Sequence, residues 1–202
     1  MKSESQRAYR KSLITNGLVY INDEEQEVSV INISLTGALV QLNSPENPES
    51  LIDDASASKI IDFYLPKLRL AGTAEVVRVS GSRRDDSLAL KFKEISYNVD
   101  NLYYKRKVYR KNMAVAGKIL LNNKQYDFQA INVSVEGLMI RLAETIIIAQ
   151  GISTAFEFKS LNLKGEAQVV WMDIDSEGKT LVGLKYINMN TDKITGIPRF
   201  AC

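Results

Sequence analysis

The chain has 202 residues, 45% of them hydrophobic and 25% charged, as expected for a soluble globular protein of one large or two small domains. The chain has no histidine and one cysteine, Cys202. This composition excludes imidazole catalysis, histidine or cysteine metal clusters and an intrachain disulfide. The net charge of +2 is uneven, because residues 1–100 carry 12 Lys and Arg against 15 Asp and Glu, whereas residues 101–202 carry 14 against 9.

The sequence repeats itself at an offset of 100 residues. Aligned without gaps, residues 7–42 and 107–142 are identical at 10 of 36 positions, where unrelated sequences of ordinary composition would share about two. In the first copy these positions are Tyr9, Arg10, Lys11, Gly17, Asn22, Ile31, Asn32, Ser34, Gly37 and Leu42. A period this long is not that of a solenoid. We therefore expect two tandem domains, residues 1–100 and 101–202.

Both copies consist of short apolar or alternating segments separated by Gly, Asn, Asp, Pro and Ser, a pattern typical of β-strands. The expected strands of the first copy are 13–21, 28–33, 38–42, 60–65, 70–80 and 87–95. Those of the second copy are 113–121, 126–133, 138–142, 153–158, 163–173 and 180–187. This predicts an all-β fold of two small barrels or sandwiches. A loop is expected over 43–58, and a short connecting helix over 96–104 with Ser96 as its N-cap.

Two clusters in the second copy carry the candidate chemistry. Residues 105–111 contain five cations in seven residues, which alone could be a solvated linker or a nucleic-acid patch. Residues 132–137, Asn-Val-Ser-Val-Glu-Gly, lie between two expected strands. Alone they would be a hairpin turn, with Asn and Ser capping it and Gly supplying a positive φ.

Together the clusters form a pattern, Arg106-x-x-x-Arg110 followed by Asn132-x-Ser134-x-x-Gly137. It resembles the RxxxR and [D/N]xSxxG signatures of the PilZ domain, the bacterial cyclic di-GMP receptor module. The resemblance covers essentially the whole chain as two copies, and implies two six-stranded β-barrels with short connecting or terminal helices. It also implies a cyclic di-GMP site at Arg106, Arg110, Asn132, Ser134 and Gly137, without catalytic residues, metal or cofactor.

The chemistry of these residues suits that ligand. Arginine can donate two parallel hydrogen bonds to a guanine edge, stack on the base plane and pair with phosphate, whereas lysine supplies only charge. The asparagine offers a donor and an acceptor, the serine adds a hydroxyl, and glycine lets backbone approach closely. Trp171, on a late strand, is interpreted as packing rather than as a ligand platform.

The first copy departs from the pattern. Its second motif is intact as Asn32-x-Ser34-x-x-Gly37, and Arg10 matches Arg110. The position aligned with Arg106, however, is Gln6, and Arg7 stands one residue late. Arg7, Arg10, Asn32, Ser34 and Gly37 therefore form a second, weaker candidate site, or a degenerate copy kept for packing or partner contact.

The resemblance implies a non-enzymatic cyclic di-GMP effector that changes conformation and partner contact, and so regulates motility, exopolysaccharide or biofilm formation. The alternative is a nucleic-acid-binding or ligand-independent protein-interaction module that uses the basic arm 105–111. Nucleic acid is disfavoured because basic residues concentrate in one short arm. No apolar run is long enough to span a bilayer, so we expect a cytoplasmic protein with a protein partner, whose identity, like the oligomeric state, the sequence leaves open.

Overall fold

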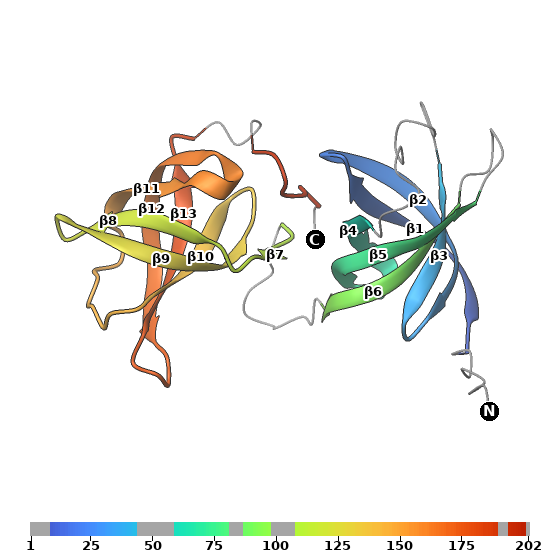
Figure 1. Ribbon diagram of the computed structural model, residues 1–202, viewed down its shortest axis with the longest axis horizontal. Helices are drawn as coiled ribbons and strands as arrows, with labels where there is room; N and C mark the ends of the chain where they lie inside the picture. The colour runs from blue at the N-terminus through green and yellow to red at the C-terminus, as the bar shows by residue number, and fades with distance from the viewer. Residues whose placement is uncertain (1–8, 44–58, 81–86, 98–107, 190–193, 201–202) are drawn as a thin grey trace. The chain divides into compact units, whose positions relative to one another are not determined.

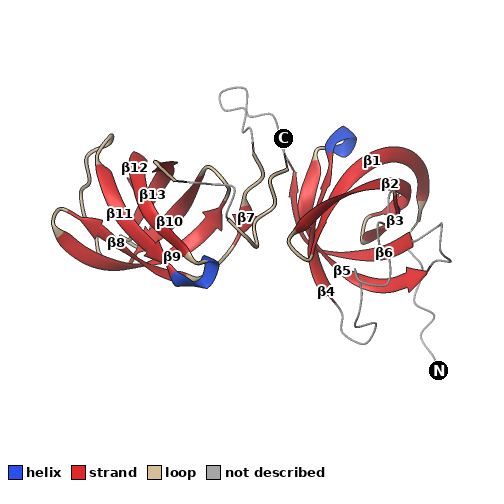
Figure 2. Cartoon of the chain, turned by 90° about the horizontal axis from the view of Figure 1, so that it is seen from above, coloured by secondary structure: helices blue, strands red, loops and turns tan. Residues whose placement is uncertain are grey.

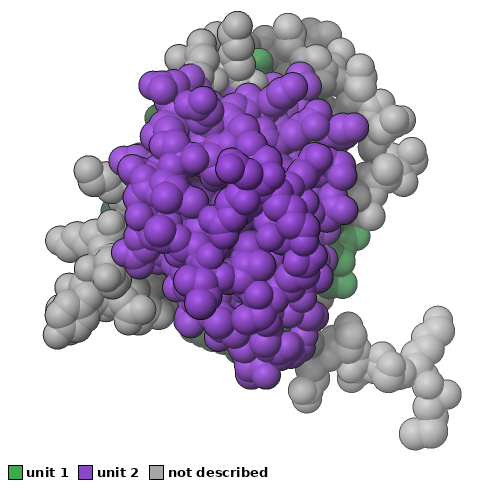
Figure 3. Space-filling model, turned by 90° about the vertical axis from the view of Figure 1, so that its left-hand side faces the viewer, with its two compact units in different colours: residues 1–107, 202 green, residues 108–201 purple. Residues whose placement is uncertain are grey.

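Each half of the chain folds into a closed antiparallel β-barrel of six strands (Figure 1). The computed structural model describes residues 9–43, 59–80, 87–97, 108–189 and 194–200. It divides the chain into two compact units, residues 1–107 with residue 202 and residues 108–201, which are coloured green and purple in Figure 3. The expected domain boundary near residue 100 lies outside the described residues.

The first barrel consists of β1 (Lys11–Ile21), β2 (Glu24–Ser34), β3 (Gly37–Leu42), β4 (Lys59–Leu65), β5 (Leu70–Ser80) and β6 (Ser87–Tyr97). The order around the barrel is β1-β2-β3-β6-β5-β4, and β1 closes it by pairing with β4. Every strand of the ring therefore has two neighbours, and the β1–β4 seam is short, with three residue pairs.

The second barrel repeats this topology. Its strands are β7 (Lys111–Asn112), β8 (Ala116–Leu121), β9 (Lys124–Val133), β10 (Gly137–Leu142), β11 (Ser153–Phe158), β12 (Leu163–Ile174) and β13 (Thr180–Ile187). The ring runs β8-β9-β10-β13-β12-β11, closed by β8 pairing with β11. The short β7 pairs with β9 and, together with β8, takes the place of β1.

Alternating side chains build each core. In β3 and β10 every second residue is buried, and these residues are Ala38, Val40, Leu42, Leu138, Ile140 and Leu142. Stacked aromatic pairs occupy equivalent places: Phe63 on Phe92, with ring centroids 4.9 Å apart, and Phe156 on Tyr186, at 5.5 Å. A strand period of two on a closed sheet therefore produces one apolar interior per copy.

The first hairpin of each barrel turns on two consecutive left-handed residues. They are Asn22 (φ 53°) and Asp23 (φ 66°) in the first barrel, and Asn122 (φ 50°) and Asn123 (φ 61°) in the second. Positive φ at both central positions is the geometry of the tight turn that matches the twist of paired strands, and Asn and Asp tolerate it best.

Two expectations need correction. Residues 113–115 are not strand, because the pairing with β9 shifts between β7 and β8. Ser96 and Tyr97 end β6 instead of opening a helix, since they pair with Ala71 and Leu70 of β5. The rest of that expected helix, and residues 44–58 of the expected loop, lie outside the described residues.

Among the described residues, the helices are two 3-10 turns, η1 (Pro66–Leu68) and η2 (Lys159–Leu161), drawn in blue in Figure 2. Each joins the fourth and fifth strands of its own barrel. In the described part of the chain no helix is long and apolar enough to cross a membrane.

Candidate ligand-binding site

The arm of the second copy is paired with the strand that carries the asparagine motif. In β7, Lys111 lies opposite Val133 and Asn112 opposite Asn132, and the Met113 amide donates to the Ile131 carbonyl at 3.0 Å. Arg110 directly precedes β7, so this register brings it level with the end of β9, where the motif turn begins. The side chain of Arg110 is exposed. The structure therefore brings the second arginine to the motif, whereas Arg106 lies outside the described residues.

Ser134 holds the turn between β9 and β10. It is buried, its Oγ accepts the amides of Glu136 (3.3 Å) and Gly137 (3.2 Å), and it donates to the Gly137 carbonyl at 3.2 Å. In the first barrel Ser34 Oγ likewise donates to the Gly37 carbonyl at 3.2 Å and accepts the Thr36 amide at 3.3 Å. The expectation that Ser134 caps the turn is confirmed, and Ser34 makes equivalent bonds in the first copy. The expectation that Asn132 caps the turn as well is wrong, because its Nδ2 bonds to Met139 Sδ and its Oδ1 has no partner among the described residues.

Gly137 is required by packing and not by its φ. It does not adopt a positive φ, so that part of the turn interpretation is wrong. Instead, a Cβ at this position would collide with the carbonyl oxygen of Leu184 on β13, and a Cβ at Gly37 would collide with that of Leu90 on β6. The motif glycine thus lets two strands approach closely beside the turn.

Asn132 carries a polar atom that nothing satisfies in the described part of the chain. Its side chain is half-buried on β9, and Nδ2 donates a weak hydrogen bond to Met139 Sδ at 3.6 Å. Its Oδ1 is buried and has no hydrogen-bond partner among the described residues. An unmade hydrogen bond of this kind costs about 1–3 kcal/mol. A ligand donor that reached Oδ1 would recover that cost.

Asn132 is part of a row of residues that crosses the outer face of the second barrel. By strand register, Asn132 pairs with Met139, Met139 with Gly183, and Gly183 with Trp171. The neighbours of Met139 and Gly183 along their strands are buried in the core, so these two residues point outward. A Cβ at Gly183 would collide with the indole of Trp171, so the ring lies over this glycine.

Sequence reasoning missed this row, apart from Asn132. Met139, Trp171 and Gly183 come from three different strands, and only the register places them side by side. One signal was present: a glycine inside the apolar run Val182-Gly183-Leu184, which marks close approach by another group. The interpretation of Trp171 as packing agrees with its half-buried position, but the structure also places it at the end of the asparagine row.

The equivalent row in the first barrel has different chemistry. Asn32 pairs with Leu39, Leu39 with Ala89, and Ala89 with Arg78. The tryptophan–glycine pair is thus replaced by an arginine–alanine pair. Arg10 is exposed and directly precedes β1, as Arg110 precedes β7. Gln6 and Arg7 lie outside the described residues.

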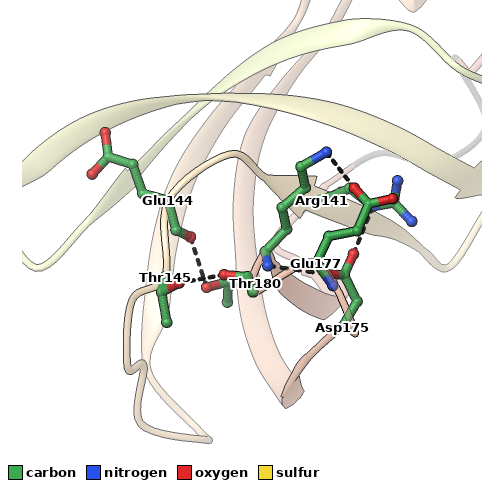
Figure 4. Close-up of polar contacts among 8 residues, drawn as sticks. Arg141, Glu144, Thr145, Asp175, Glu177 and Thr180 are labelled. Carbon is green, nitrogen blue, oxygen red and sulfur yellow. Dashed lines mark hydrogen bonds and ion pairs between the residues drawn. The ribbon is translucent and has the colours of Figure 1, made fainter.

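A polar cluster ties together the strands that carry the row (Figure 4). Arg141 Nε on β10 lies 3.3 Å from Asp175 Oδ2 in the β12–β13 turn. The other oxygen, Oδ1, accepts the amides of Glu177 (2.9 Å) and Lys179 (3.0 Å). The Lys179 amide is the main reason that the pKa of Asp175 is lowered from its ordinary value. The cluster fixes the β12–β13 hairpin, on which Trp171 and Gly183 lie, against β10.

In the described part of the chain, no group of three or more Asp, Glu or Cys residues is arranged to hold a metal ion. Arginine, asparagine, methionine and tryptophan side chains on one outer face can instead bind an anionic, planar ligand by charge, hydrogen bonding and stacking. The site so described is a candidate for ligand binding.

Solved structures that are similar to this chain include a Bacillus subtilis inhibitor of motility, MotI/DgrA, at 14% identity and a TM-score of 0.39, covering 90% of this chain and 92% of that one. They also include YcgR of Escherichia coli in complex with c-di-GMP, at 13% identity and 0.35, covering 88% and 78%. A third is the MrkH–c-di-GMP complex of K. pneumonia, at 8% and 0.37, covering 93% and 92%.

A search among curated protein sequences gave no significant match. The family model of the PilZ domain, by contrast, matches this chain twice, over residues 4–102 and over residues 104–200. Each match spans one of the two barrels and contains its asparagine–serine–glycine turn. The chain therefore belongs to the PilZ domain family and contains two tandem copies of that domain.

Proposed function

We propose that this protein is a cyclic di-GMP receptor whose main site lies on the outer face of the second barrel. The observation that carries the proposal is the buried Oδ1 of Asn132, which has no hydrogen-bond partner among the described residues and lies on β9, the strand that pairs with β7 directly after Arg110. Guanine presents N–H donors that would satisfy this acceptor. The two phosphate groups of the ligand match the cations of the arm.

The remaining residues divide into ligand contacts and shaping residues. Arg106 and Arg110 would bind guanine edges and phosphates from the arm side. Met139 and Trp171 offer a polarizable, apolar surface on which a base plane can lie. Ser134 and Gly137 hold the conformation of the turn and do not contact the ligand. The serine hydroxyl is already hydrogen-bonded within the turn, and the glycine leaves room for the backbone of β13.

In the first barrel, Arg7, Arg10, Asn32, Ser34 and Gly37 form a weaker site. It lacks the arginine that Gln6 replaces, and its outer row ends in Arg78 instead of a tryptophan. A second candidate function for this copy is contact with a protein partner. It is favoured by Tyr9 and Leu35, whose side chains are 85% and 89% exposed.

The protein acts by binding and not by turnover. Ligand that neutralises the cations of the basic arm changes the placement of the two barrels, and this change presents a new surface to the partner. The output belongs to motility, exopolysaccharide or biofilm control, in the cytoplasm. Small-angle scattering with and without saturating cyclic di-GMP tests the change, and superimposable curves would refute it.

The binding proposal is tested by calorimetry on the full chain. Cyclic di-GMP should bind in the nanomolar-to-micromolar range and GMP far more weakly. Arg110→Ala should cost about 2 kcal/mol, roughly thirty-fold in affinity, because it removes a charge-assisted contact. Arg10→Ala, at the equivalent position of the first barrel, is the matched control and should have a smaller effect on the tight site. Equal affinities of Arg110→Ala and wild type would refute the site.

The alternative, nucleic-acid binding through the arm, has its own signature. An electrophoretic shift with random single strands, weakening steeply as salt rises, would support that function, because such binding releases counterions from the phosphate backbone. A shift that persists in the presence of excess cyclic di-GMP would place the two ligands on different surfaces.

A further inference from the structure

Residues 194–200, which we call the C-terminal segment, contact the basic arm on both sides of Arg110. Before Arg110, the Tyr109 amide donates to the Phe200 carbonyl at 3.0 Å, and the two rings lie with centroids 5.4 Å apart. After Arg110, Lys111 Nζ donates to the Gly196 carbonyl at 3.2 Å. The segment is therefore bonded to the residues immediately before and after this arginine, to the backbone at Tyr109 and to the side chain at Lys111.

The C-terminal segment is itself anchored in the second barrel. Ile194 and Ile197 are buried and belong to the apolar core of that barrel. Val135, in the motif turn between Ser134 and Gly137, belongs to the same core. Phe200 is fully buried. One short segment without regular structure thus links the arm to the barrel core, to which the motif turn also contributes Val135.

The first barrel provides an internal comparison. Tyr9 and Leu35 occupy the positions of Tyr109 and Val135 in the repeat. Tyr109 and Val135 are 6% and 7% exposed, whereas Tyr9 and Leu35 are almost fully exposed. The tyrosine is the same in both copies, so its burial depends on what covers it. Among the described residues, the ring that covers it in the second copy is that of Phe200.

We propose that Phe200 is a positioning residue for the ligand: it fixes the arm so that Arg110 is already placed when cyclic di-GMP arrives. This inference rests on the proposed function of the site. An arm without this attachment would have to be ordered during binding, and ordering one backbone residue weakens affinity by about ten-fold. Attachment in advance removes that loss, which is the general benefit of preorganisation.

The same contacts make the C-terminal segment respond to the ligand. A ligand that holds Arg110 restrains Tyr109 and Lys111, and these restrain Phe200 and Gly196 through the contacts described. Coupling of this kind is reciprocal, so the segment strengthens ligand binding as much as ligand stabilises the segment. Saturating cyclic di-GMP should therefore slow hydrogen exchange at the Tyr109 amide and across residues 194–200.

The test is a double-mutant cycle on the full chain, with cyclic di-GMP affinity measured by calorimetry. Phe200→Ala should weaken binding about ten-fold. In an Arg110→Ala background, Phe200→Ala should have little further effect, because Phe200 acts through that arginine. Phe200→Tyr, which keeps the ring, should restore most of the affinity. Thr195→Ala, an exposed position in the same segment, is the matched control and should bind like wild type.

The outcomes separate this proposal from the proposed function. A wild-type chain that does not bind cyclic di-GMP overturns both. Tight binding that is unchanged by Phe200→Ala, or equal losses from Phe200→Ala with and without Arg110, overturns the positioning role alone. If Phe200→Ala fails to fold, hydrogen exchange on the wild type decides. Unaltered exchange at Tyr109 and residues 194–200 under saturating ligand overturns the role, and slowed exchange that is absent in Arg110→Ala supports it.

Discussion

The indole ring of Trp171 lies over Gly183, its partner on the neighbouring strand, and occupies the space of a side chain that glycine lacks. Gly183→Ala should therefore displace the ring and destabilise the second barrel by about 1–3 kcal/mol, as overpacking does. Trp171 is the only tryptophan in the chain, so its fluorescence reports this displacement directly. Chemical denaturation followed by that fluorescence measures the loss.

The first barrel suggests the control for this prediction. Its equivalent pair is Arg78 with Ala89, in which the alanine is accommodated. The double variant Trp171→Arg, Gly183→Ala should regain most of the stability lost by Gly183→Ala alone, here followed by circular dichroism. An equally unstable double variant would show that the cost arises elsewhere on β13.

Asn132→Leu should separate stability from ligand binding. The substitution removes a buried acceptor that has no partner among the described residues, so the free energy of unfolding should stay within about 1 kcal/mol of wild type or rise. Affinity for cyclic di-GMP should nevertheless fall by roughly ten-fold or more, because the ligand loses its hydrogen-bond partner. A thermal melt and calorimetry on the same preparation check both quantities. Parallel losses of stability and affinity would contradict this assignment.

Gln6→Arg should strengthen binding at the first barrel. It places a guanidinium where the second copy has Arg106. The guanidinium supplies both the positive charge and the planar pair of N–H donors that glutamine lacks. Ligand titration of the wild type should saturate with the second barrel alone accounting for tight binding, and the variant should show a second site. If Arg10→Ala abolished tight binding while Arg110→Ala did not, the roles of the two copies would be reversed.

Tyr186→Phe should change the response of the protein to alkali. Burial raises the pKa of the Tyr186 hydroxyl above its ordinary value of 10.0, so the folded protein keeps it neutral. The unfolded chain ionises this phenol above about pH 10, so the stability due to the neutral phenol is complete below that pH and is lost as pH rises. The variant should lose less stability between pH 9 and pH 11, measured by denaturant titration.

The first barrel indicates that this variant will fold. Phe92 stands at the equivalent position and stacks on Phe63 as Tyr186 stacks on Phe156. The Tyr186 hydroxyl is buried without a hydrogen-bond partner among the described residues, so its removal should change stability at neutral pH by less than about 1 kcal/mol. Tyr126→Phe controls for the loss of one phenol. The same alkaline slope in wild type and Tyr186→Phe would contradict the prediction.

The strands could be predicted from the sequence because burial alternates along them, as in β10 and β11. The break at residues 113–115 could not. Met113 and Val115 still pack against the core, and the Ala130 amide still donates to the Val115 carbonyl at 2.8 Å. The apolar residues of this segment therefore predict burial correctly. The shift in strand register does not change which residues are apolar, so the sequence pattern does not reveal it.

The site was only partly predictable for a similar reason. Glycine is selected both by positive φ and by close approach, and the sequence at Gly137 does not tell these apart. The row from Asn132 to Trp171 depends on the pairing of strands that are far apart in the chain. Phe200 lies outside any strand or helical pattern, so nothing in its local sequence points to the arm.

The seam that closes the second barrel is the shortest ladder of its six-strand ring. Two residue pairs, Ile119 with Phe156 and Lys118 with Glu157, join β8 to β11, whereas six join β11 to β12. A ladder with few residue pairs is the easiest to separate, so local opening of the second barrel would begin at this seam. Such opening would part β8 from β11 while leaving β8 paired with β9 and the β9–β10 hairpin in place.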